Sequence, residues 1–283
     1  MIFDTTLRDG LQNIKTTEFG NYSTQYKLEL YNEIKAKHKP EFVEVGSLVS
    51  KKYFPIFSDS VEIFTQTNNE IVGKNFLLVP SMSKLKLAID TGCNNFSFIS
   101  SVSESFQLAN TNKTIQQTKA EIVEMMYEIA SNPKISNPKL KIYISCIDHC
   151  PKEGMISLDF IVDEIIYYNE VFKPDIICLS DTCASLTYES FISIVDKANK
   201  GGVPYHKLSL HLHVNNSNPN YYSNLQKIFN ASMDRKITQW DLSLLETGGC
   251  VMTLDNSNIK PNLSYELYYK LLVDYIVSKS QIF

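Results

Sequence analysis

Short apolar runs alternate with longer amphipathic segments along most of the chain. Eight runs have the composition of buried β-strands: Ile2–Thr6, Phe42–Gly46, Phe76–Pro80, Phe96–Ser100, Leu140–Cys146, Ile176–Leu179, Leu208–His213 and Trp240–Leu244. Between several of them, apolar residues recur every three or four positions, which predicts helices at 22–37, 113–132, 157–171, 187–200 and 219–232, with a closing helix at Tyr265–Val277. The pattern therefore predicts strands and helices in strict alternation.

This alternation runs over residues 1–283 without a linker or a low-complexity tract. It predicts an α/β protein with one domain, a (β/α)₈ TIM barrel, for which a chain of this length is typical. A doubly wound open sheet is the alternative. Such a sheet normally has a G-x-G-x-x-G turn after its first strand, and "TTLRDGLQN" has none, so the barrel is favoured.

Composition narrows the possible partners. The net charge is −4 and there is no basic block, which argues against nucleic acid or an anionic membrane as a partner. No apolar run reaches membrane-spanning length, and neither a signal peptide nor a peroxisomal signal is recognised. Six cysteines in a chain this long do not form the pattern of a disulfide framework. We therefore expect a reducing, cytoplasmic location with free thiols.

Two histidines one residue apart, His211 and His213, lie on the seventh predicted strand in the stretch "HLHVNNSN". Residues two apart on a strand face the same side, so both imidazoles are expected inside the barrel mouth. Active sites of such barrels lie at the carboxyl ends of the strands. Together with Asp9, at the end of the first strand, the histidines would form a mixed nitrogen and oxygen site for a divalent metal. Histidines that only bind core carbonyls are the alternative.

Two other strand ends carry residues that could take part in catalysis. Arg8 precedes Asp9, and such a pair is costly to bury for structure alone but suits stabilisation of an enolate or a carboxylate. A surface ion pair is the alternative. Cys250 follows two glycines after the last strand, which predicts a thiol on a flexible loop over the barrel mouth.

Six segments, in this order, resemble the motifs of one family. They are "LRDGLQN" (7–13), "FVEVGSLVSKKYFP" (42–55), "SCIDHCPKEG" (145–154), "LSDT" (179–182), "HLH" (211–213) and "GGC" (248–250). Together they are similar to the DRE-TIM metallolyase superfamily and, within it, to the 3-hydroxy-3-methylglutaryl-CoA lyases. The resemblance covers nearly the whole chain. It implies a metal-dependent carbon–carbon lyase that cleaves 3-hydroxy-3-methylglutaryl-CoA, or a close analogue, to acetyl-CoA and acetoacetate.

The resemblance also implies a set of metal ligands. Asp9, His211 and His213 would hold Mg²⁺ or Mn²⁺, joined by an asparagine that follows the cysteine loop. The segment "PNLSYE" fits the position of that asparagine. Asn262 is therefore preferred to Asn256 or Asn258.

Four residues are implied in catalysis. By resemblance, Arg8 would stabilise the enolate of the departing acetyl-CoA, and Cys250 would handle the proton delivered to the acetyl carbon. Glu44 and Asp181 would position the substrate hydroxyl and help to move its proton.

The implied substrate contacts lie on the same strand ends. Arg8, Gln12, Ser47 and Thr182 would orient the acyl group, and Lys15 would meet the phosphates of the coenzyme. An acyl-CoA is thus the expected partner, and a homodimer is compatible with the resemblance.

Two other readings compete with the lyase. The opening "DTTLRDG" is equally like the Claisen-condensing synthases that make isopropylmalate, homocitrate or citramalate, but these usually have a glutamate soon after the RDG and a long C-terminal regulatory region. Leu11-Gln12-Asn13 follows here, and the chain ends after the barrel, which favours a lyase. The second is an inactive barrel that binds an acyl-CoA, against which the combination of motif residues argues. Departures after the "HLH" and "LSDT" motifs lie near the acyl and coenzyme pockets and leave room for a close analogue.

Overall fold

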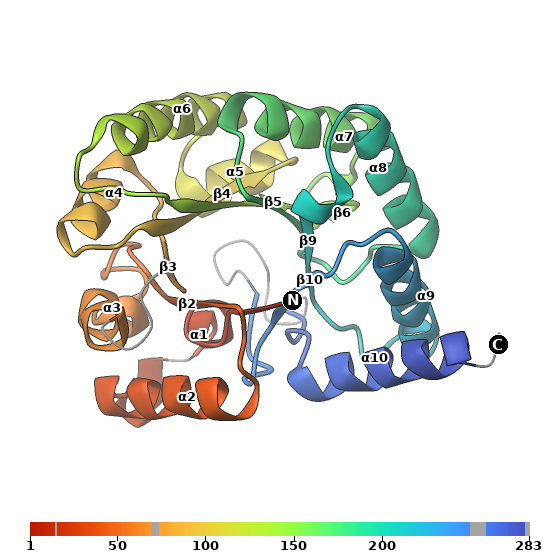
Figure 1. Ribbon diagram of the computed structural model, residues 1–283, viewed down its shortest axis with the longest axis horizontal. Helices are drawn as coiled ribbons and strands as arrows, with labels where there is room; N and C mark the ends of the chain where they lie inside the picture. Colours follow the sequence, from red (N-terminus) through yellow and green to blue (C-terminus); the bar gives the residue numbers. More distant parts are fainter. Residues whose placement is uncertain (15, 69–73, 250–258, 281–283) are drawn as a thin grey trace.

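The computed structural model describes residues 1–14, 16–68, 74–249 and 259–280. Its parallel strands close into a barrel in the order β1-β10-β9-β8-β5-β4-β3-β2, with helices around the outside (Figure 1). The barrel strands are β1 (Ile2–Asp4), β2 (Phe42–Ser47), β3 (Asn75–Leu78), β4 (Asn95–Ser101), β5 (Lys139–Ser145), β8 (Ile176–Asp181), β9 (Leu208–Leu212) and β10 (Gln239–Leu242). The predicted (β/α)₈ barrel is confirmed.

The helices follow the strands as the pattern requires. They are α1 (Asp9–Gln12), α2 (Thr24–Lys37), α3 (Ser60–Asn68), α4 (Met82–Asp90), α5 (Glu104–Thr111), α6 (Ile115–Ser131), α7 (Leu158–Tyr167), α8 (Tyr188–Lys200), α9 (Tyr221–Asp234) and α10 (Tyr265–Ser280). Short 3₁₀ segments lie at Thr16–Asn21, Pro55–Phe57 and Tyr205–Lys207, and a π turn at Tyr168–Phe172. Apolar periodicity located the long helices, but the shorter α3, α4 and α5 were not singled out. Among the described helices, none combines the length and the apolar character needed to cross a bilayer.

One further element lies outside the barrel. Strands β6 (His149–Cys150) and β7 (Gly154–Met155) form an antiparallel hairpin in the connection that follows β5.

Polar side chains cap the N-termini of several helices. The side chains of Ser23, Ser103, Thr114 and Thr187 each accept a hydrogen bond from a backbone N–H in the first turn. At α6 the bond is reciprocal, because Gln117 also accepts from the backbone of Thr114. These caps define where the four helices begin.

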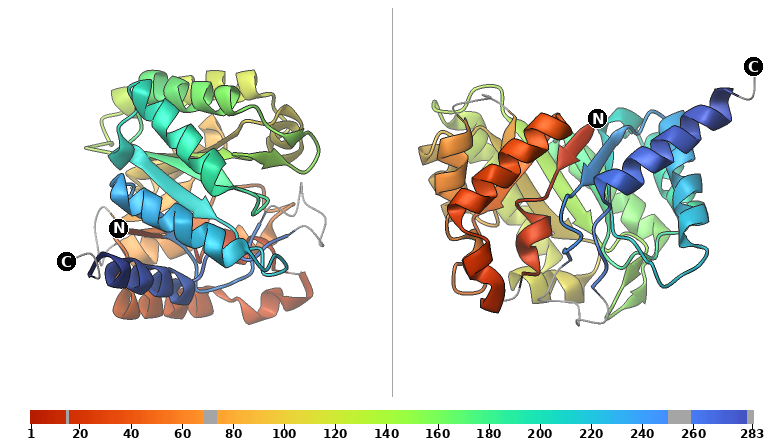
Figure 2. Two further views of the ribbon diagram at one scale, coloured as in Figure 1. Left: turned by 90° about the vertical axis from the view of Figure 1, so that its right-hand side faces the viewer. Right: turned by 90° about the horizontal axis from the view of Figure 1, so that it is seen from below.

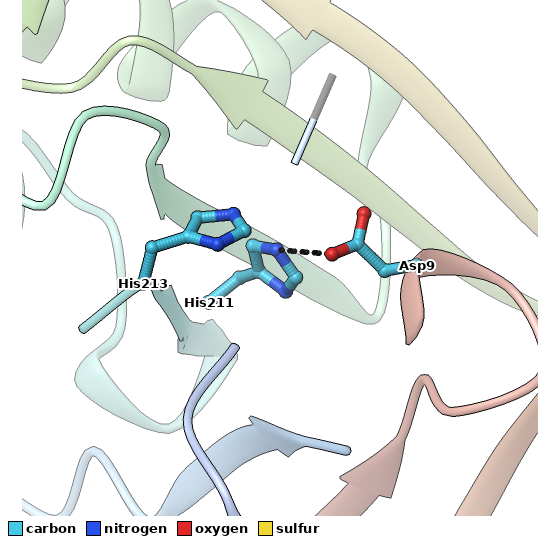
Figure 3. A group of neighbouring side chains, drawn as sticks. All are labelled: Asp9, His211 and His213. Atoms are coloured by element: carbon cyan, nitrogen blue, oxygen red, sulfur yellow. Dashed lines mark ion pairs between the residues drawn. The ribbon is translucent and has the colours of Figure 1, made fainter. Parts of the chain in front are cut away.

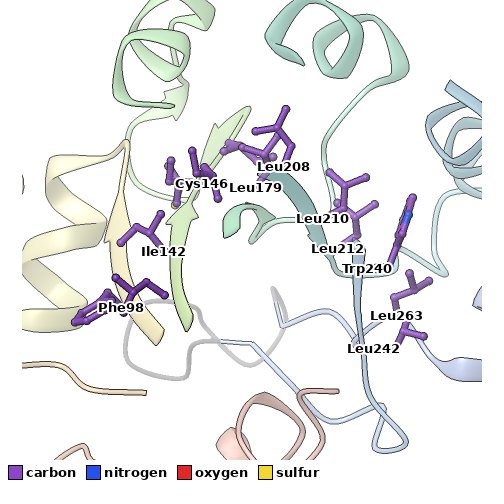
Figure 4. Packing of buried hydrophobic residues seen from close by; sticks show 14 of the residues in the cluster. Phe98, Ile142, Cys146, Leu179, Leu208, Leu210, Leu212, Trp240, Leu242 and Leu263 are labelled. Carbon is purple, nitrogen blue, oxygen red and sulfur yellow. The ribbon is translucent and has the colours of Figure 1, made fainter. Parts of the chain in front are cut away.

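The outward faces of the strands pack against the helices. Leu208, Leu210 and Leu212 of β9 lie in the same buried cluster as Trp240 of β10 (Figure 4). The Trp240 ring contacts Phe229 of α9, with centroids 5.0 Å apart. The leucines therefore face outward, which turns the histidines of the same strand inward, as predicted for the histidines.

The barrel interior is apolar at the bottom and polar towards the top. Phe3, Phe76 and Ile176, with Phe42 beside them, make an apolar floor. Fully buried charged side chains occur higher in the interior, where branched apolar residues are usual in such barrels. This polar layer lies directly below the candidate site.

The ring of helices closes between α2 and α10, which lie side by side below the barrel in Figure 1 and near the front of the right-hand view in Figure 2. His38, just after α2, stacks on Tyr265 of α10 with centroids 3.8 Å apart. The Tyr265 hydroxyl donates to Asp4 of β1 at 2.8 Å. The last helix is thus anchored to the first strand.

Candidate metal centre and active site

Three ligand-type side chains meet at the carboxyl end of the barrel. Asp9 begins α1 directly after β1, His211 lies on β9, and His213 follows that strand. One ligand atom from each lies within 4.8 Å of the others, and Figure 3 shows the carboxylate directed at the two rings. The Nε2 atom of His211 is 3.7 Å from Oδ2 of Asp9. The convergence expected from the sequence is therefore present.

Each imidazole is held by its other nitrogen. His213 Nδ1 lies 3.0 Å from the carbonyl oxygen of Lys260, and His211 Nδ1 lies 3.2 Å from Oδ2 of Asp241. Carbonyl and carboxylate oxygens only accept, so both Nδ1 atoms must donate. In the neutral rings this leaves the lone pair on Nε2 for a metal. Burial and the neighbouring His211 lower the pKa of His213 to about 4, so this ring is neutral at pH 7.

Asn262 comes to the same place by a backbone bridge to the end of β9. Val214 N donates to Pro261 O at 2.7 Å, and Leu263 N donates to Leu212 O at 3.1 Å, which pairs Asn262 with His213. The Asn262 amide donates to Thr247 O at 3.1 Å, and its Oδ1 is buried with no hydrogen-bond partner among the described residues.

A glycine makes room for this asparagine. A Cβ atom at Gly248 would overlap the Asn262 amide, so only glycine allows this close approach without a shift. The loop that contains Gly248 thus leaves room for Asn262, the side chain that the resemblance assigns to the metal.

Arg8 and Asp9 form a buried pair, not a surface one. Arg8 Nη1 donates to Asp9 Oδ1 at 2.6 Å, and Arg8 Nε donates to Glu44 Oε2 at 2.5 Å. The Tyr143 hydroxyl also donates to Glu44 Oε2, at 3.0 Å, and its ring lies 4.8 Å from the guanidinium carbon. Burial alone would raise the pKa of Asp9, but the charge of Arg8 and the two imidazoles lower it to about 2. Asp9 is therefore a carboxylate at neutral pH.

The donor set fits a divalent cation. Asp9 Oδ2 and Asn262 Oδ1 are both buried without a hydrogen-bond partner within the described part of the chain, and a buried orphan oxygen is costly unless something binds it. In the network of buried ion pairs at the site, Arg8 and Lys141 contact three carboxylates, those of Asp9, Glu44 and Asp241. Within this network the three carboxylates outnumber the two cations by one, and a bound metal cation would offset the excess negative charge. Two imidazole nitrogens with carboxylate and amide oxygens suit a first-row divalent metal or Mg²⁺.

A cavity of about 630 Å³ opens beside these ligands. Arg8, Gln12, Ser47 and Thr182, the described residues among those expected to contact substrate, all lie on its wall together with Asp9, His211 and His213. The same wall includes a set of apolar residues, Val49, Phe54, Phe57, Leu78, Ile99 and Phe106. The cavity is therefore lined by the polar candidate ligands and by apolar side chains.

Glu44 and Asp181 lie behind the wall of this cavity. Glu44 is fully buried beneath Arg8. Asp181 accepts from the backbone N–H groups of Ser185 and Leu186, each at 3.0 Å, and so shapes the loop after β8. Burial raises the pKa of Asp181 to about 7 despite these bonds.

The expected roles of Cys250 and Lys15, and the rejected ligands Asn256 and Asn258, lie outside the described residues. The described cysteines are all free.

Three supporting residues were not foreseen. Lys141, Tyr143 and Asp241 lie beneath the ligands and bind them or their partners. A signal was present in the sequence, because charged residues interrupt two otherwise apolar strands, in "LKIYIS" and "QWDL". Such a residue on the inward face of a strand must have a partner in the interior.

Fold and site together define a (β/α)₈ barrel with a candidate metal centre, formed by two histidines and a carboxylate, at its mouth. The HMGL-like family model matches residues 1–218. The chain belongs to the HMGL-like family, and the resemblance to the hydroxymethylglutaryl-CoA lyases is confirmed.

Curated relatives carry lyase names. The mitochondrial hydroxymethylglutaryl-CoA lyase of Arabidopsis thaliana is 29% identical over 247 residues, which is 86% of this chain but 48% of the relative. The 3-hydroxy-3-isohexenylglutaryl-CoA/hydroxymethylglutaryl-CoA lyase of Pseudomonas aeruginosa is 26% identical over 246 residues, 86% of this chain and 75% of the relative. The chain thus spans about half the length of the first of these relatives.

Solved structures agree with the fold. The HMG-CoA lyase of Brucella melitensis superposes with a TM-score of 0.82 at 22% identity, covering 96% of this chain and 89% of that one. An HMG-CoA lyase of Acinetobacter baumannii, solved in complex with coenzyme A and 3-methylmalate, superposes with a TM-score of 0.80 at 22% identity, covering 100% and 83%.

Proposed function

We propose that the chain is a divalent-metal-dependent carbon–carbon lyase that cleaves 3-hydroxy-3-methylglutaryl-CoA, or a close analogue, to acetyl-CoA and acetoacetate. The names of the curated relatives support this class of reaction, and the coenzyme A complex of a protein with the same fold supports an acyl-CoA substrate. Asp9, His211, His213 and Asn262 would hold the metal. Mg²⁺ or Mn²⁺, when bound, would supply Lewis acidity for the oxygens of the substrate.

The observation that carries the proposal is the position of Arg8. Its guanidinium lies on the cavity wall beside a metal ligand, held between Asp9 at 2.6 Å and Glu44 at 2.5 Å. Cleavage of the carbon–carbon bond leaves an enolate on the acetyl-CoA fragment. A cation already held in place stabilises that charge without reorganising during the reaction.

Other residues of the wall would orient the acyl group. Gln12, Ser47 and Thr182 offer an amide and two hydroxyl groups on the cavity wall. Glu44 and Asp181 lie behind the wall, so they would position the substrate hydroxyl indirectly, Glu44 by holding Arg8 and Asp181 by shaping the loop that carries Thr182. Cys250 would complete the reaction by giving a proton to the acetyl carbon.

The apolar residues of the cavity wall favour an analogue as an additional substrate. Leu78 and Ile99 pack with Val49 next to the Tyr143 ring, and all three line the cavity. An alkyl branch larger than methyl would gain about 0.8 kcal/mol for each CH₂ group buried against such side chains. A curated relative is named for a substrate with an isohexenyl branch, which supports this proposal.

The test is a direct assay with purified protein and Mg²⁺ or Mn²⁺. We expect acetyl-CoA to be released from 3-hydroxy-3-methylglutaryl-CoA or from a 3-alkyl homologue in the same series, and a chelator should stop the reaction.

Two outcomes would contradict the proposal. If acetyl-CoA and a 2-keto acid are consumed and free CoA appears with a thiol reagent, while every 3-hydroxy-3-alkylglutaryl-CoA stays intact, the protein is a condensing synthase. If neither reaction occurs although an acyl-CoA is retained, it is a binding protein.

A further inference from the structure

A buried ion pair lies directly beneath His211. Lys141 Nζ is 2.6 Å from Oδ1 and 2.8 Å from Oδ2 of Asp241, and both side chains are fully shielded from solvent. The same Oδ2 atom accepts from Nδ1 of His211 at 3.2 Å. Lysine, aspartate and histidine thus form a chain of contacts that ends at a proposed metal ligand.

Topology requires this chain to cross the barrel. Lys141 lies on β5 and Asp241 on β10, and two other strands, β8 and β9, separate β5 from β10 in the sheet. A direct contact between their side chains must therefore run through the interior. The ammonium group also lies 3.3 Å from the centroid of the Phe3 ring, at the barrel floor.

Strand β5 also supports the contacts that hold Arg8 and Asp9. Tyr143, two residues along the same inward face, donates to Glu44, which holds Arg8 against Asp9. Lys141 Nζ lies 4.4 Å from the Tyr143 ring centroid, so the contacts beneath His211 and those beneath Asp9 meet at this point. One strand thus stands beneath two of the proposed ligands.

We propose that Lys141 and Asp241 are positioning residues for the metal centre: Lys141 orients Asp241, and Asp241 fixes the tautomer and direction of His211. This inference rests on the proposed function, because it assumes that His211 is a ligand. Outer partners of metal-binding histidines typically contribute roughly 10–100-fold in metal affinity or activity.

Folding stability alone does not explain why a buried ion pair is present at this position. Desolvating two charges costs several kcal/mol, and well-packed apolar side chains of similar volume are often equally or more stabilising. Apolar residues are also the usual filling at this level of a barrel. The contact with His211 supplies a reason for both charges.

The test separates positioning from charge and from packing. The double variant Lys141→Met/Asp241→Leu removes one positive and one negative charge, so the net charge of the site is unchanged. Apolar replacement of both partners should keep the folding stability close to that of the wild type. We expect Mn²⁺ affinity, measured by titration with detection of free Mn²⁺ by electron paramagnetic resonance, to fall by about 10–100-fold.

The single variant Lys141→Met gives a second, independent test, in which the direction of the change in Mn²⁺ affinity is decisive. It makes the site more negative, so charge alone predicts tighter Mn²⁺ binding. If Lys141 acts by orienting Asp241, binding should weaken instead.

A matched control is the pair Lys119–Glu164, at 2.5 Å in the helical layer. Lys119→Met/Glu164→Leu removes a largely buried lysine–carboxylate pair between α6 and α7 and should leave Mn²⁺ affinity unchanged. Wild-type affinity in the folded Lys141→Met/Asp241→Leu variant would overturn the inference. Failure of the wild type to bind Mn²⁺ would instead refute the metal site of the proposed function.

Discussion

At the scale of single residues, Arg8 joins the proposed metal ligands to the cavity. It is buried, it forms an ion pair with Asp9, and it is held by Glu44, which accepts a hydrogen bond from Tyr143. This position suits a cation that would stabilise the negative charge developing on the enolate.

The variant Arg8→Met should keep the fold and still bind acyl-CoA, but kcat should fall by about 100-fold or more, because a cation preorganised for the enolate is lost. Arg8→Lys is the control that keeps the charge. It should recover only part of the rate, since an ammonium group cannot hold Asp9 and Glu44 with a planar fork. Steady-state kinetics give the measurement, and a loss confined to KM would contradict the assignment.

His213 is a proposed metal ligand whose ring is buried against His211, while its backbone bridge to Asn262 does not depend on the side chain. His213→Ala should retain its circular dichroism spectrum, while Mn²⁺ affinity should fall by more than the roughly 10–100-fold typical of an outer partner. His206, which is exposed on another part of the surface, offers the control His206→Ala with no expected effect. Equal Mn²⁺ binding by the wild type and His213→Ala, measured by calorimetry, would remove His213 from the site.

At the scale of elements, the proposed metal centre depends on a loop and a strand end that are joined by a backbone bridge. Residues 261–263 pair with the end of β9, and Gly248 leaves the space that Asn262 fills. The proposed fourth ligand, Asn262, is therefore positioned by three separate parts of the chain.

Gly248→Ala should displace the Asn262 amide, because the added methyl group would overlap it. Overpacking of this kind costs about 1–3 kcal/mol of folding free energy, and Mn²⁺ affinity should fall with it. Gly20, which has open space around its Cα, gives the control Gly20→Ala. Thermal unfolding and Mn²⁺ titration measure both effects. A Gly248→Ala variant with unchanged Mn²⁺ affinity would show that Asn262 is not a ligand.

At the scale of the whole molecule, the site joins strands from both ends of the chain, since Asp9 follows β1 and the histidines lie at β9. Metal binding should therefore stabilise the complete barrel. At a Mn²⁺ concentration about 100 times the Kd, linkage adds about 2.7 kcal/mol, which raises Tm by roughly 5 °C in a chain of this size. Calorimetry with and without a chelator measures the shift, and His213→Ala should show none. If the Tm of the wild type does not change when Mn²⁺ is added, this would argue against a metal site.

Local pattern was sufficient for the barrel and for much of the site. Periods of two and of three to four residues are properties of neighbouring positions, so eight strands and the long helices could be predicted from them. The pair of histidines on one face, and the acid at another strand end, then followed from the rule that strand ends meet at one rim. The family motifs added Asn262, whose place no local period indicates.

Only the tertiary structure decided which buried groups hold the site in place. Lys141 and Asp241 are 100 positions apart in the chain, and two strands separate them in the sheet, so no local pattern could pair them. The positions of Glu44 and Asp181 behind the cavity wall likewise depend on closure of the barrel, because closure decides which other side chains cover each carboxylate. Sequence determines the inward or outward direction of each side chain, because that follows from local periodicity. Partners across the interior follow from closure of the barrel, which brings distant strands to within hydrogen-bond range.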